Sequence, residues 1–337
     1  MMKKIRTAVI GCGYFGSMHA EIYASASGAD LIAVVDRDDE KAGDLAKRLL
    51  CRPYGSLGAA LSSEEIDLVD VCLPDSLHTD AVLQAMAADK HIFIEKPLAD
   101  TLDNARRLMM AAVDYPRKIT VGHICRFDIR YVKAREAIQS GALGDIIYIA
   151  SKRNSPVLGA RRYARHCKLL THSGVHDLDL VRWFLGSEYQ QVYAASRRVR
   201  MIHEGYPDTD DAVLAVFTLD NGVTYSLENC WALPDQFPSY IDAKMNIVGT
   251  RGAIQIDFAD QGYQFAGNSH YELPDIAYWP EVNGLRSGDL RLELEDFIEC
   301  IQQDRQPRVT VRDGYEVALA AVKAMESAAI GQVVTLR

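Results

Sequence analysis

The sequence predicts an α/β protein of two domains, the first built on a parallel sheet and the second on a large, mostly antiparallel open sheet. The 337-residue length favours two domains over one. Up to about residue 122, short apolar runs alternate with helix-like segments, which is typical of βαβ units. Later apolar runs follow one another through turn signals, as in antiparallel sheets. We therefore expect domains at residues 1–122 and 123–337.

The first apolar run, Ile5–Ile10, leads directly into a glycine-rich segment with the spacing GxGxxG. Glycines at these positions permit a tight turn, the close approach of a pyrophosphate, and close packing of the next helix on the strand. The free N–H groups at that helix N-terminus favour an anion. We expect a dinucleotide to be held here by Gly11, Gly13, Tyr14, Phe15 and Gly16.

The second apolar run, Leu31–Val35, is closed by Asp36, at about the distance where this fingerprint places an acid for the adenosine ribose. A carboxylate repels a 2′-phosphate, so Asp36 favours NAD. Arg37 can neutralise part of that repulsion, which leaves NADP open. Asp36 can instead serve as a cap or turn residue before the next helix.

Two further predicted strands end in polar residues. In an open parallel sheet, ligands bind beyond the carboxyl ends of the strands, so we expect Pro74, Asp75 and His78 beside the cofactor. Asp75 can equally cap the helix that follows it, and capping is the more common role.

The other such strand, His91–Glu95, is followed by Lys96 and Pro97. Proline ends the strand sharply, and the Lys96–Pro97 bond can be cis or trans. Glu95 and Lys96 are therefore expected where cofactor and substrate meet. The alternative is that Lys96 merely closes the strand as an ion-pair partner of Glu95.

The second half of the chain contains the hairpin signal Asp220-Asn221-Gly222, for which we predict a type I′ turn. Helices near Leu290–Gln302 and Tyr315–Ala329 are expected to cover one face of the antiparallel sheet. The other face is expected to pair with a second subunit, which predicts a homodimer or homotetramer.

His172 and His176 lie four residues apart, at the start of a predicted helix that ends at Gly186. Both can be structural, or His176 can transfer protons while His172 tunes it, since imidazole titrates near neutrality. A metal site lacks both the nearby glutamate of a zinc-protease helix and a third ligand, so we expect no metal.

Composition excludes several classes of partner. The formal net charge of −9 disfavours nucleic acid and anionic membranes, which need concentrated Lys and Arg. The seven cysteines are scattered and form no CxxC pair, which favours a reducing compartment. No signal peptide or membrane-spanning stretch is evident, so we expect a cytoplasmic protein.

Taken together, these motifs resemble the Gfo/Idh/MocA oxidoreductase family, over almost the whole chain. The resemblance implies an N-terminal Rossmann domain and a C-terminal α/β domain whose open sheet is used for oligomerisation. It also implies that Lys96 orients the substrate hydroxyl and that His176 is the general acid/base. The segments that carry it are Gly11–Gly16, Glu95–Pro97, Arg126–Phe127, Gly174–Leu180 with Trp183, and Leu294–Phe297 with Pro307.

The chain departs from the family pattern at His172, where many members carry an aspartate, so the substrate is open. We expect an NAD(P)-dependent oxidoreductase acting on a secondary alcohol of a sugar, inositol or sugar derivative. The alternatives are a redox-neutral, NAD-using glycosidase or epimerase and a non-catalytic cofactor sensor. Beyond Lys96, His172 and His176, the further candidates for substrate contact are Arg126, Arg153, Asn154 and Tyr163.

Overall fold

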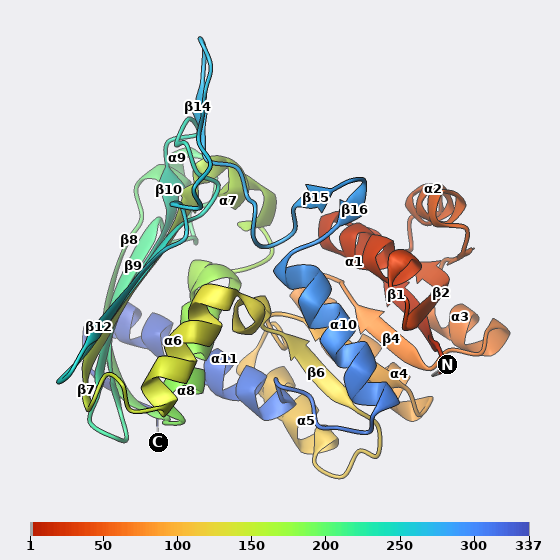
Figure 1. Ribbon diagram of the computed structural model, residues 1–337, viewed down its shortest axis with the longest axis horizontal. Helices are drawn as coiled ribbons and strands as arrows, with labels where there is room; N and C mark the ends of the chain where they lie inside the picture. The colour runs from red at the N-terminus through yellow and green to blue at the C-terminus, as the bar shows by residue number, and fades with distance from the viewer. Residues whose placement is uncertain (1–2, 337) are drawn as a thin grey trace. The chain divides into compact units, whose positions relative to one another are not determined.

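In the computed structural model, which describes residues 3–336, the chain forms two compact units (Figure 1). Unit 1 takes the chain up to Phe127 together with Tyr278–Tyr315, and unit 2 takes Asp128–Ala277 together with the chain from Glu316 onward. The sequence suggested one division, after residue 122. The structure differs because a second segment, Tyr278–Tyr315, returns to unit 1.

Unit 1 is organised on a six-stranded sheet with the order β3-β2-β1-β4-β5-β6, in which every pairing is parallel. The central strands are buried, as the continuous apolar runs predicted. The strand order reverses between β1 and β4, and in such sheets ligands bind at that point. The strands are β1 (Ile5–Ile10), β2 (Ala29–Val35), β3 (Arg52–Tyr54), β4 (Leu68–Val71), β5 (His91–Glu95) and β6 (Ile119–Gly122).

The helices of unit 1 begin where the sequence supplies caps: the side chains of Asp38, Ser56 and Thr101 accept N–H groups at the starts of α2, α3 and α5. Because Asp38 caps α2, Asp36 is left for another role. The helices are α1 (Tyr14–Ser25), α2 (Asp39–Leu49), α3 (Leu57–Ser63), α4 (His78–Ala87), α5 (Leu102–Ala112) and α10 (Asp289–Gln302).

The position of α10 corrects an expectation. The sequence suggested that this helix covers the antiparallel sheet, but α10 packs beside α1 and contacts β1, all within unit 1 (Figure 1). Its apolar face, which includes Leu290, Leu294 and Phe297, is buried there. An amphipathic pattern predicts that a helix packs against a core, but it does not say which core.

Unit 2 is organised on a seven-stranded sheet with the order β12-β11-β7-β10-β9-β8-β17. The sheet is mixed: β10 pairs with β7 in parallel and the other pairings are antiparallel. The strands are β7 (Ile146–Pro156), β8 (Tyr189–Arg197), β9 (Ala212–Leu219), β10 (Thr224–Leu233), β11 (Asp242–Gly249), β12 (Ala253–Asp257) and β17 (Val334–Thr335).

The hairpin between β9 and β10 forms at the predicted place but with another turn. A type I′ turn needs positive φ at both central residues, and here only Gly222 has it, at 84°. Backbone bonds join Leu219 to Val223 and to Gly222. The loop is therefore a three-residue one with glycine in the left-handed position, as in a turn followed by a bulge.

The helices α6 (Ile129–Gln139), α8 (Val175–Leu185) and α11 (Val311–Ile330) cover one face of this sheet (Figure 1). The Tyr189 hydroxyl donates to the carbonyl of Leu178 in α8, and Ser327 of α11 accepts the N–H of Ala194. On the opposite face, Leu214 and Val216 of β9 are about half exposed.

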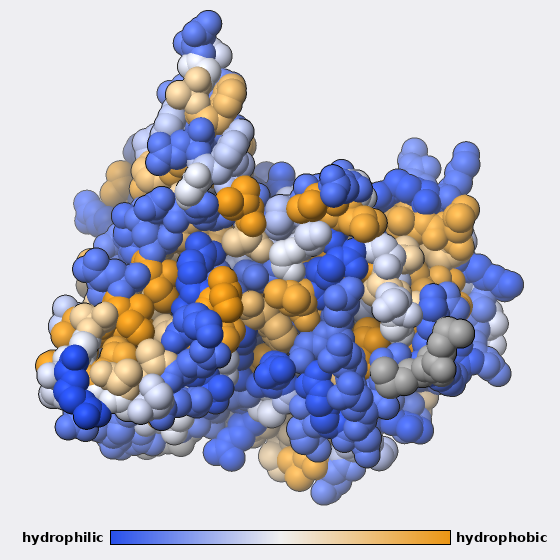
Figure 2. All heavy atoms as spheres, viewed as in Figure 1, coloured by the Kyte–Doolittle hydropathy of each residue, from blue (hydrophilic) through white to orange (hydrophobic). Residues whose placement is uncertain are grey.

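Unit 2 also contains the short helices α7 (Val157–Tyr163) and α9 (Arg200–His203), a π-helical turn at Leu170–Gly174, and a hairpin formed by β13 (Phe265–Ala266) and β14 (Tyr271–Glu272). Unit 1 adds the small hairpin of β15 (Glu281–Val282) and β16 (Leu285–Arg286). Figure 2 shows a hydrophilic tip on the projecting β13–β14 hairpin, with less hydrophilic side chains below it. Among the described residues, none of the helices has the length and apolarity needed to cross a membrane.

Candidate functional site

The loop between β1 and α1 has the geometry that its glycines predict. Gly11 has φ +100°, and a Cβ there would lie 2.4 Å from the carbonyl oxygen of Cys72. A Cβ on Gly16 would lie 1.7 Å from the Gly11 oxygen, whereas one on Gly13 would meet nothing within 4 Å. The chain itself therefore requires Gly11 and Gly16, while Gly13 keeps the space before α1 open.

A pocket of about 590 Å³ opens beside this loop, at the point where the strand order reverses. Asp36 is fixed at its edge, because its carboxylate accepts the N–H of Cys12 at 2.8 Å and that of Asp38 at 3.0 Å. The lining residues come from the ends of β1, β2 and β4 and from the starts of α2, α3 and α4. Those predicted from sequence are Gly11, Gly13, Asp36, Arg37 and Pro74.

The pocket fits a dinucleotide on three counts. The start of α1 has no side-chain cap in the described structure, and the space above Gly13 is open, so a pyrophosphate can approach the helix N-terminus. The Asp36 carboxylate lines the pocket, where a ribose can meet it. Apolar side chains such as Leu57, Leu73 and Leu77 line the rest, as an adenine ring requires.

The other predicted cofactor residues lie around this pocket without lining it. The Phe15 ring packs edge-on against Trp279 and Tyr14. His78 is buried, and its ring nitrogens lie 2.9 Å from the Pro97 oxygen and 2.8 Å from the Leu73 oxygen. These bonds tie α4 to the ends of β4 and β5, which is a structural role.

Asp75 also takes a local role in the structure. It begins a single 3-10 turn, Asp75–Leu77, and is buried. Its carboxylate accepts the N–H of the next residue, Ser76, at 2.8 Å. Neither this turn nor α4 has a side-chain cap in the described structure, so the capping role that the sequence offered for Asp75 is not formed.

The strand β5 ends at Glu95, and the peptide bond that joins the next residue, Lys96, to Pro97 is cis. The Glu95 carboxylate accepts the backbone N–H of Lys96 at 3.1 Å, and its other oxygen lies 3.4 Å from Nε2 of His19. Burial raises the pKa of Glu95, but His19 and Lys96 lower it, and the pKa lies below its ordinary value. Glu95 is therefore a largely buried carboxylate whose lowered pKa favours the ionised form, not a simple surface partner of Lys96.

In unit 2, the two predicted histidines lie on different kinds of helical turn. His172 belongs to a π-helical turn, Leu170–Gly174, and His176 lies in the first turn of α8; both side chains are half-buried. The His172 ring stacks on Tyr163, with ring centroids 4.3 Å apart, and lies 6.2 Å from the Trp231 ring. The candidate substrate residue Tyr163 is thus held by His172.

Two of the predicted substrate residues prove to be buried and ion-paired. In unit 2, Arg153 of β7 is 4% exposed and its Nε lies 2.6 Å from the carboxylate of Asp177 in α8. In unit 1, Arg126 donates to the Arg308 carbonyl at 2.8 Å and lies 3.4 Å from Asp313. The guanidinium of Arg153 therefore joins β7 to α8, and that of Arg126 supports the backbone at Arg308.

Asn154, the remaining substrate candidate, is also buried. Its amide nitrogen donates to Glu228 of β10 at 2.6 Å. Both residues lie in the parallel pair of strands β7 and β10. The contact therefore fastens the middle of the unit 2 sheet.

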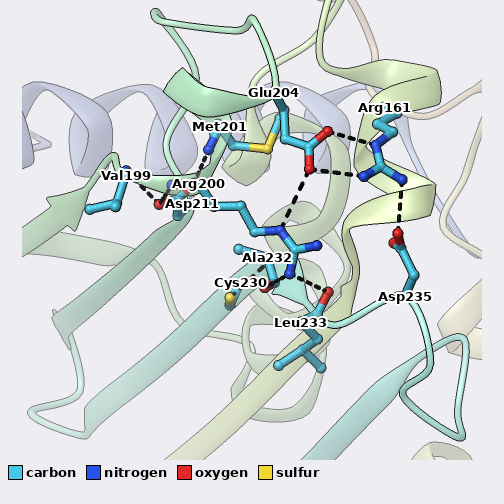
Figure 3. Close-up of polar contacts among 10 residues, drawn as sticks. All are labelled: Arg161, Val199, Arg200, Met201, Glu204, Asp211, Cys230, Ala232, Leu233 and Asp235. Atoms are coloured by element: carbon cyan, nitrogen blue, oxygen red, sulfur yellow. Dashed lines mark hydrogen bonds and ion pairs between the residues drawn. The ribbon is translucent and has the colours of Figure 1, made fainter.

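A surface ion network surrounds α7 and α9 (Figure 3). Arg161 donates two bonds of 2.8 Å to Glu204 and a third to Asp235. Asp211 accepts three N–H groups at the start of α9, those of Val199, Arg200 and Met201. The guanidinium of Arg161 is therefore neutralised by two carboxylates.

Sequence reasoning missed several residues of the site. Ser56, Asp80 and Gln84 line the pocket from the N-cap of α3 and from α4, and their signal was their place in the segments that follow β3 and β4. His19 was also missed. Within residues 3–336, the group that could hold a metal ion is His19, Asp70 and Cys72, and it does not include His172 or His176.

Comparison with known proteins identifies the family to which the chain belongs. Residues 5–123 match an oxidoreductase family with an NAD-binding Rossmann fold, and residues 135–336 match the C-terminal alpha/beta domain of that family. The chain therefore belongs to the Gfo/Idh/MocA oxidoreductase family and is an NAD-dependent dehydrogenase. Its cofactor is NAD, which is consistent with the pocket and with Asp36.

Relatives within the family carry different activities in their names. Inositol 2-dehydrogenase of Rubrobacter xylanophilus is 30% identical over 75% of this chain and 72% of its own. The 2,7-anhydro-N-acetylneuraminate hydratase of Escherichia coli is 29% identical over 87% of this chain and 79% of its own. The crystal structure of myo-inositol 2-dehydrogenase from Lactobacillus plantarum superposes with a TM-score of 0.87 at 22% identity, covering 99% of this chain and all of the other, which shows a shared fold.

Proposed function

We propose that this protein oxidises a secondary hydroxyl of an inositol or a related sugar derivative to a ketone with NAD. The observation that carries the proposal is a dinucleotide pocket with Asp36 at its edge, in a chain that also contains Lys96 at the end of β5. Support for the substrate class comes from the relatives named inositol 2-dehydrogenase.

In this proposal, NAD held at Gly11, Gly13 and Asp36 would supply the hydride-accepting chemistry, and the chain positions the substrate and moves the proton. The Lys96 ammonium donates a hydrogen bond to the reacting oxygen and stabilises negative charge that develops there. The His176 imidazole accepts the hydroxyl proton. His172 and Tyr163, stacked on each other, orient the substrate.

The test is a screen of inositols and sugars with NAD and with NADP, which follows absorbance of the reduced nicotinamide. Wild-type protein is expected to reduce NAD with at least one polyol. Lys96→Ala and His176→Ala are each expected to lower kcat by about 100-fold or more, the range for lost acid–base catalysis, with NAD affinity little changed. Wild-type turnover in both variants would refute the assigned roles.

A second candidate is favoured by the relative named a hydratase, because hydration involves no net oxidation. In this version NAD is recycled within one turnover, and the net reaction is hydration, glycoside cleavage or epimerisation of a sugar. The probe is 2,7-anhydro-N-acetylneuraminate, followed by mass spectrometry of the product. Product without accumulated reduced cofactor supports this version, whereas accumulation with a polyol supports the dehydrogenase.

We also propose that the protein forms a homodimer or homotetramer through the uncovered face of the unit 2 sheet. Tyr193, Leu214 and Val216 project from neighbouring strands on this face, beside a hollow of about 500 Å³. Exposed apolar side chains on a sheet usually mark a contact surface. Leu214→Glu is expected to reduce the mass measured by light scattering to that of a monomer.

The compartment is proposed as the cytoplasm. Within the described residues, none of the seven cysteines forms a disulfide bond, as in a reducing environment. Separation of cell extracts into cytoplasmic and envelope fractions, with detection of the chain by antibody, tests this location.

A further inference from the structure

His19 lies at the centre of a polar cluster inside unit 1. It occupies the inward face of α1, and both it and Asp70 of β4 have no exposed side-chain surface. Its Nδ1 lies 2.9 Å from Oδ2 of Asp70 and 3.3 Å from the sulfur of Cys72, and its Nε2 lies 3.4 Å from Oε1 of Glu95. The imidazole thus bridges the carboxyl ends of two neighbouring strands, β4 and β5.

The bridge has a defined protonation state. Nδ1 is hydrogen-bonded to Asp70, whereas Nε2 has no hydrogen-bond partner among the described residues and faces Glu95 at 3.4 Å as an ion-pair contact. Burial lowers the pKa of His19, but Cys72 and Asp70 raise it, and the pKa lies well above its ordinary value. The ionisable groups that face the ring are Asp70, Cys72 and Glu95.

Glu95 continues the chain of contacts to Lys96. One oxygen of its carboxylate faces His19, and the other accepts the backbone N–H of Lys96 at 3.1 Å. The neighbouring strand leaves room for this arrangement, because a Cβ on Gly122 would lie only 3.0 Å from Oε1 of Glu95. A carboxylate in this space has both oxygens committed, and its orientation fixes the backbone at Lys96.

We propose that His19 is a positioning residue for Lys96 and that it acts through Glu95. The imidazole ring, itself fixed by Asp70, lies against the Glu95 carboxylate and keeps it in the orientation that accepts the Lys96 N–H, so that the ammonium leaves β5 in a single direction. This inference rests on the proposed role of Lys96 in hydride transfer. Small displacements of a catalytic group reduce turnover strongly, which is why such a support matters.

The same cluster suits two further roles, and each can be told apart from positioning. The first is a metal site at His19, Asp70 and Cys72, since these ligand atoms all lie within 4.8 Å of one another. The second is a purely structural ion pair between His19 and Asp70. The contact of His19 with Asp70 is shorter than its contact with Glu95. These three roles predict different effects on activity for conservative substitutions of His19.

The experiment compares His19→Gln with His19→Asn in the full-length protein with NAD, and uses His91→Gln as the control. The glutamine nitrogen occupies about the place of Nε2 and keeps the contact to Glu95, whereas the asparagine nitrogen replaces Nδ1 and keeps the contact to Asp70. His91 lies at the opposite end of β5, where its ring accepts the N–H of Lys118. The measurements are kcat and KM with myo-inositol, the NAD dissociation constant and the free energy of unfolding.

We expect His19→Asn to lower kcat about tenfold or more, because the contact that positions Glu95 is lost, with the NAD dissociation constant unchanged. His19→Gln is expected to retain kcat within about threefold of wild type, and His91→Gln is expected to retain all of it. A structural role for the Asp70 contact predicts the opposite order of the two His19 variants. The proposal is overturned by that order, or by values of kcat that fall in proportion to the loss of stability across the variants. It is also overturned if elemental analysis finds stoichiometric metal in the purified protein.

A second measurement separates this inference from the proposed function. If the wild type oxidises no polyol, the proposed function fails on its own, and acetylation of Lys96 by limiting acetic anhydride then decides the inference. Mass spectrometry compares that rate with the rate at the exposed Lys133. A changed ratio in His19→Asn, with a wild-type ratio in His19→Gln, supports the positioning role; an identical ratio in all variants overturns it.

Discussion

Each of the two proposed chemical groups stands next to a buried ionic partner, and the two partners are built differently. In unit 1, Glu95 precedes Lys96 and is contacted by His19. In unit 2, Asp177 follows His176 and is paired with Arg153. Burial favours the neutral acid in both cases, yet the pKa of Glu95 lies below its ordinary value and that of Asp177 lies above it.

The difference follows from the number of cations around each carboxylate. Glu95 has His19 and Lys96 near it, and the interactions that lower its pKa together exceed the effect of burial. Asp177 has the guanidinium of Arg153 as its cation, and burial outweighs it. The ion pair of unit 2 is therefore the more fragile, because loss of Arg153 leaves a buried carboxylate whose ionised form burial already disfavours.

The largest expected effect tests that fragility. Arg153→Met leaves Asp177 buried and without its arginine, and we expect the free energy of unfolding to fall by about 3–5 kcal/mol in urea denaturation. The control Lys244→Met removes a largely exposed pair with Asp257, for which we expect less than about 1 kcal/mol. Adding Asp177→Leu to Arg153→Met is expected to recover most of the loss.

The same variant tests the substrate role that the sequence suggested for Arg153. A residue that contacts substrate raises KM when it is replaced, without loss of stability. A stable Arg153→Met protein with a raised KM would therefore contradict the ion-pair interpretation and restore the substrate role.

A smaller effect is expected in the glycine loop of unit 1. Gly16→Ala forces a Cβ against the Gly11 oxygen, and we expect a loss of at least about 2 kcal/mol of stability without any cofactor. Gly13→Ala meets no atom of the chain, so its stability is expected to stay within about 0.5 kcal/mol of wild type while NAD binding weakens. Calorimetric titration with NAD and thermal unfolding of both variants measure this contrast. Equal stability of the two variants would contradict it.

The sequence predicted the parallel sheet of unit 1 because most of its strands are largely apolar runs closed by a polar or glycine residue. The strand β3, Arg52–Tyr54, is not such a run and was not predicted. The burial of two key residues also has a local signal. Arg153 lies two residues beyond Ser151 and four beyond Ile149, on the inward side of an alternating strand, which indicates burial. His19 lies among Met18, Ile22 and Tyr23 on the buried face of α1.

What the sequence could not supply is the identity of partners far along the chain. His19 meets Asp70 and Glu95, and Arg153 meets Asp177, only after the strands are arranged in space. For the same reason, the pattern of α10 revealed an amphipathic helix but not its return to unit 1. Local periodicity determines which face is buried, and the choice among buried faces is made by packing of the whole chain.

The smallest expected effect concerns His91, at the start of β5. Its pKa is lowered, whereas that of His19 is raised. Burial and the nearby Arg117 lower the pKa of His91 from 6.5 to about 4. Between these values the unfolded chain binds the proton more tightly than the folded one, so stability is present above pH 6.5 and is lost as the pH falls towards 4. Because the side chain is only partly buried, we expect a loss of about 1–2 kcal/mol, less than the full shift implies.

His91→Gln can still accept the Lys118 N–H but does not titrate, so it is expected to flatten the fall in unfolding free energy between pH 6.5 and 4. His270→Gln, on the exposed β13–β14 hairpin, is the control and is expected to retain the wild-type slope. Urea denaturation at a series of pH values measures both slopes. An unchanged slope in His91→Gln would mean that other groups cause the acid sensitivity of unit 1, and the contrast between the buried charged His19 and the partly buried neutral His91 would then fail.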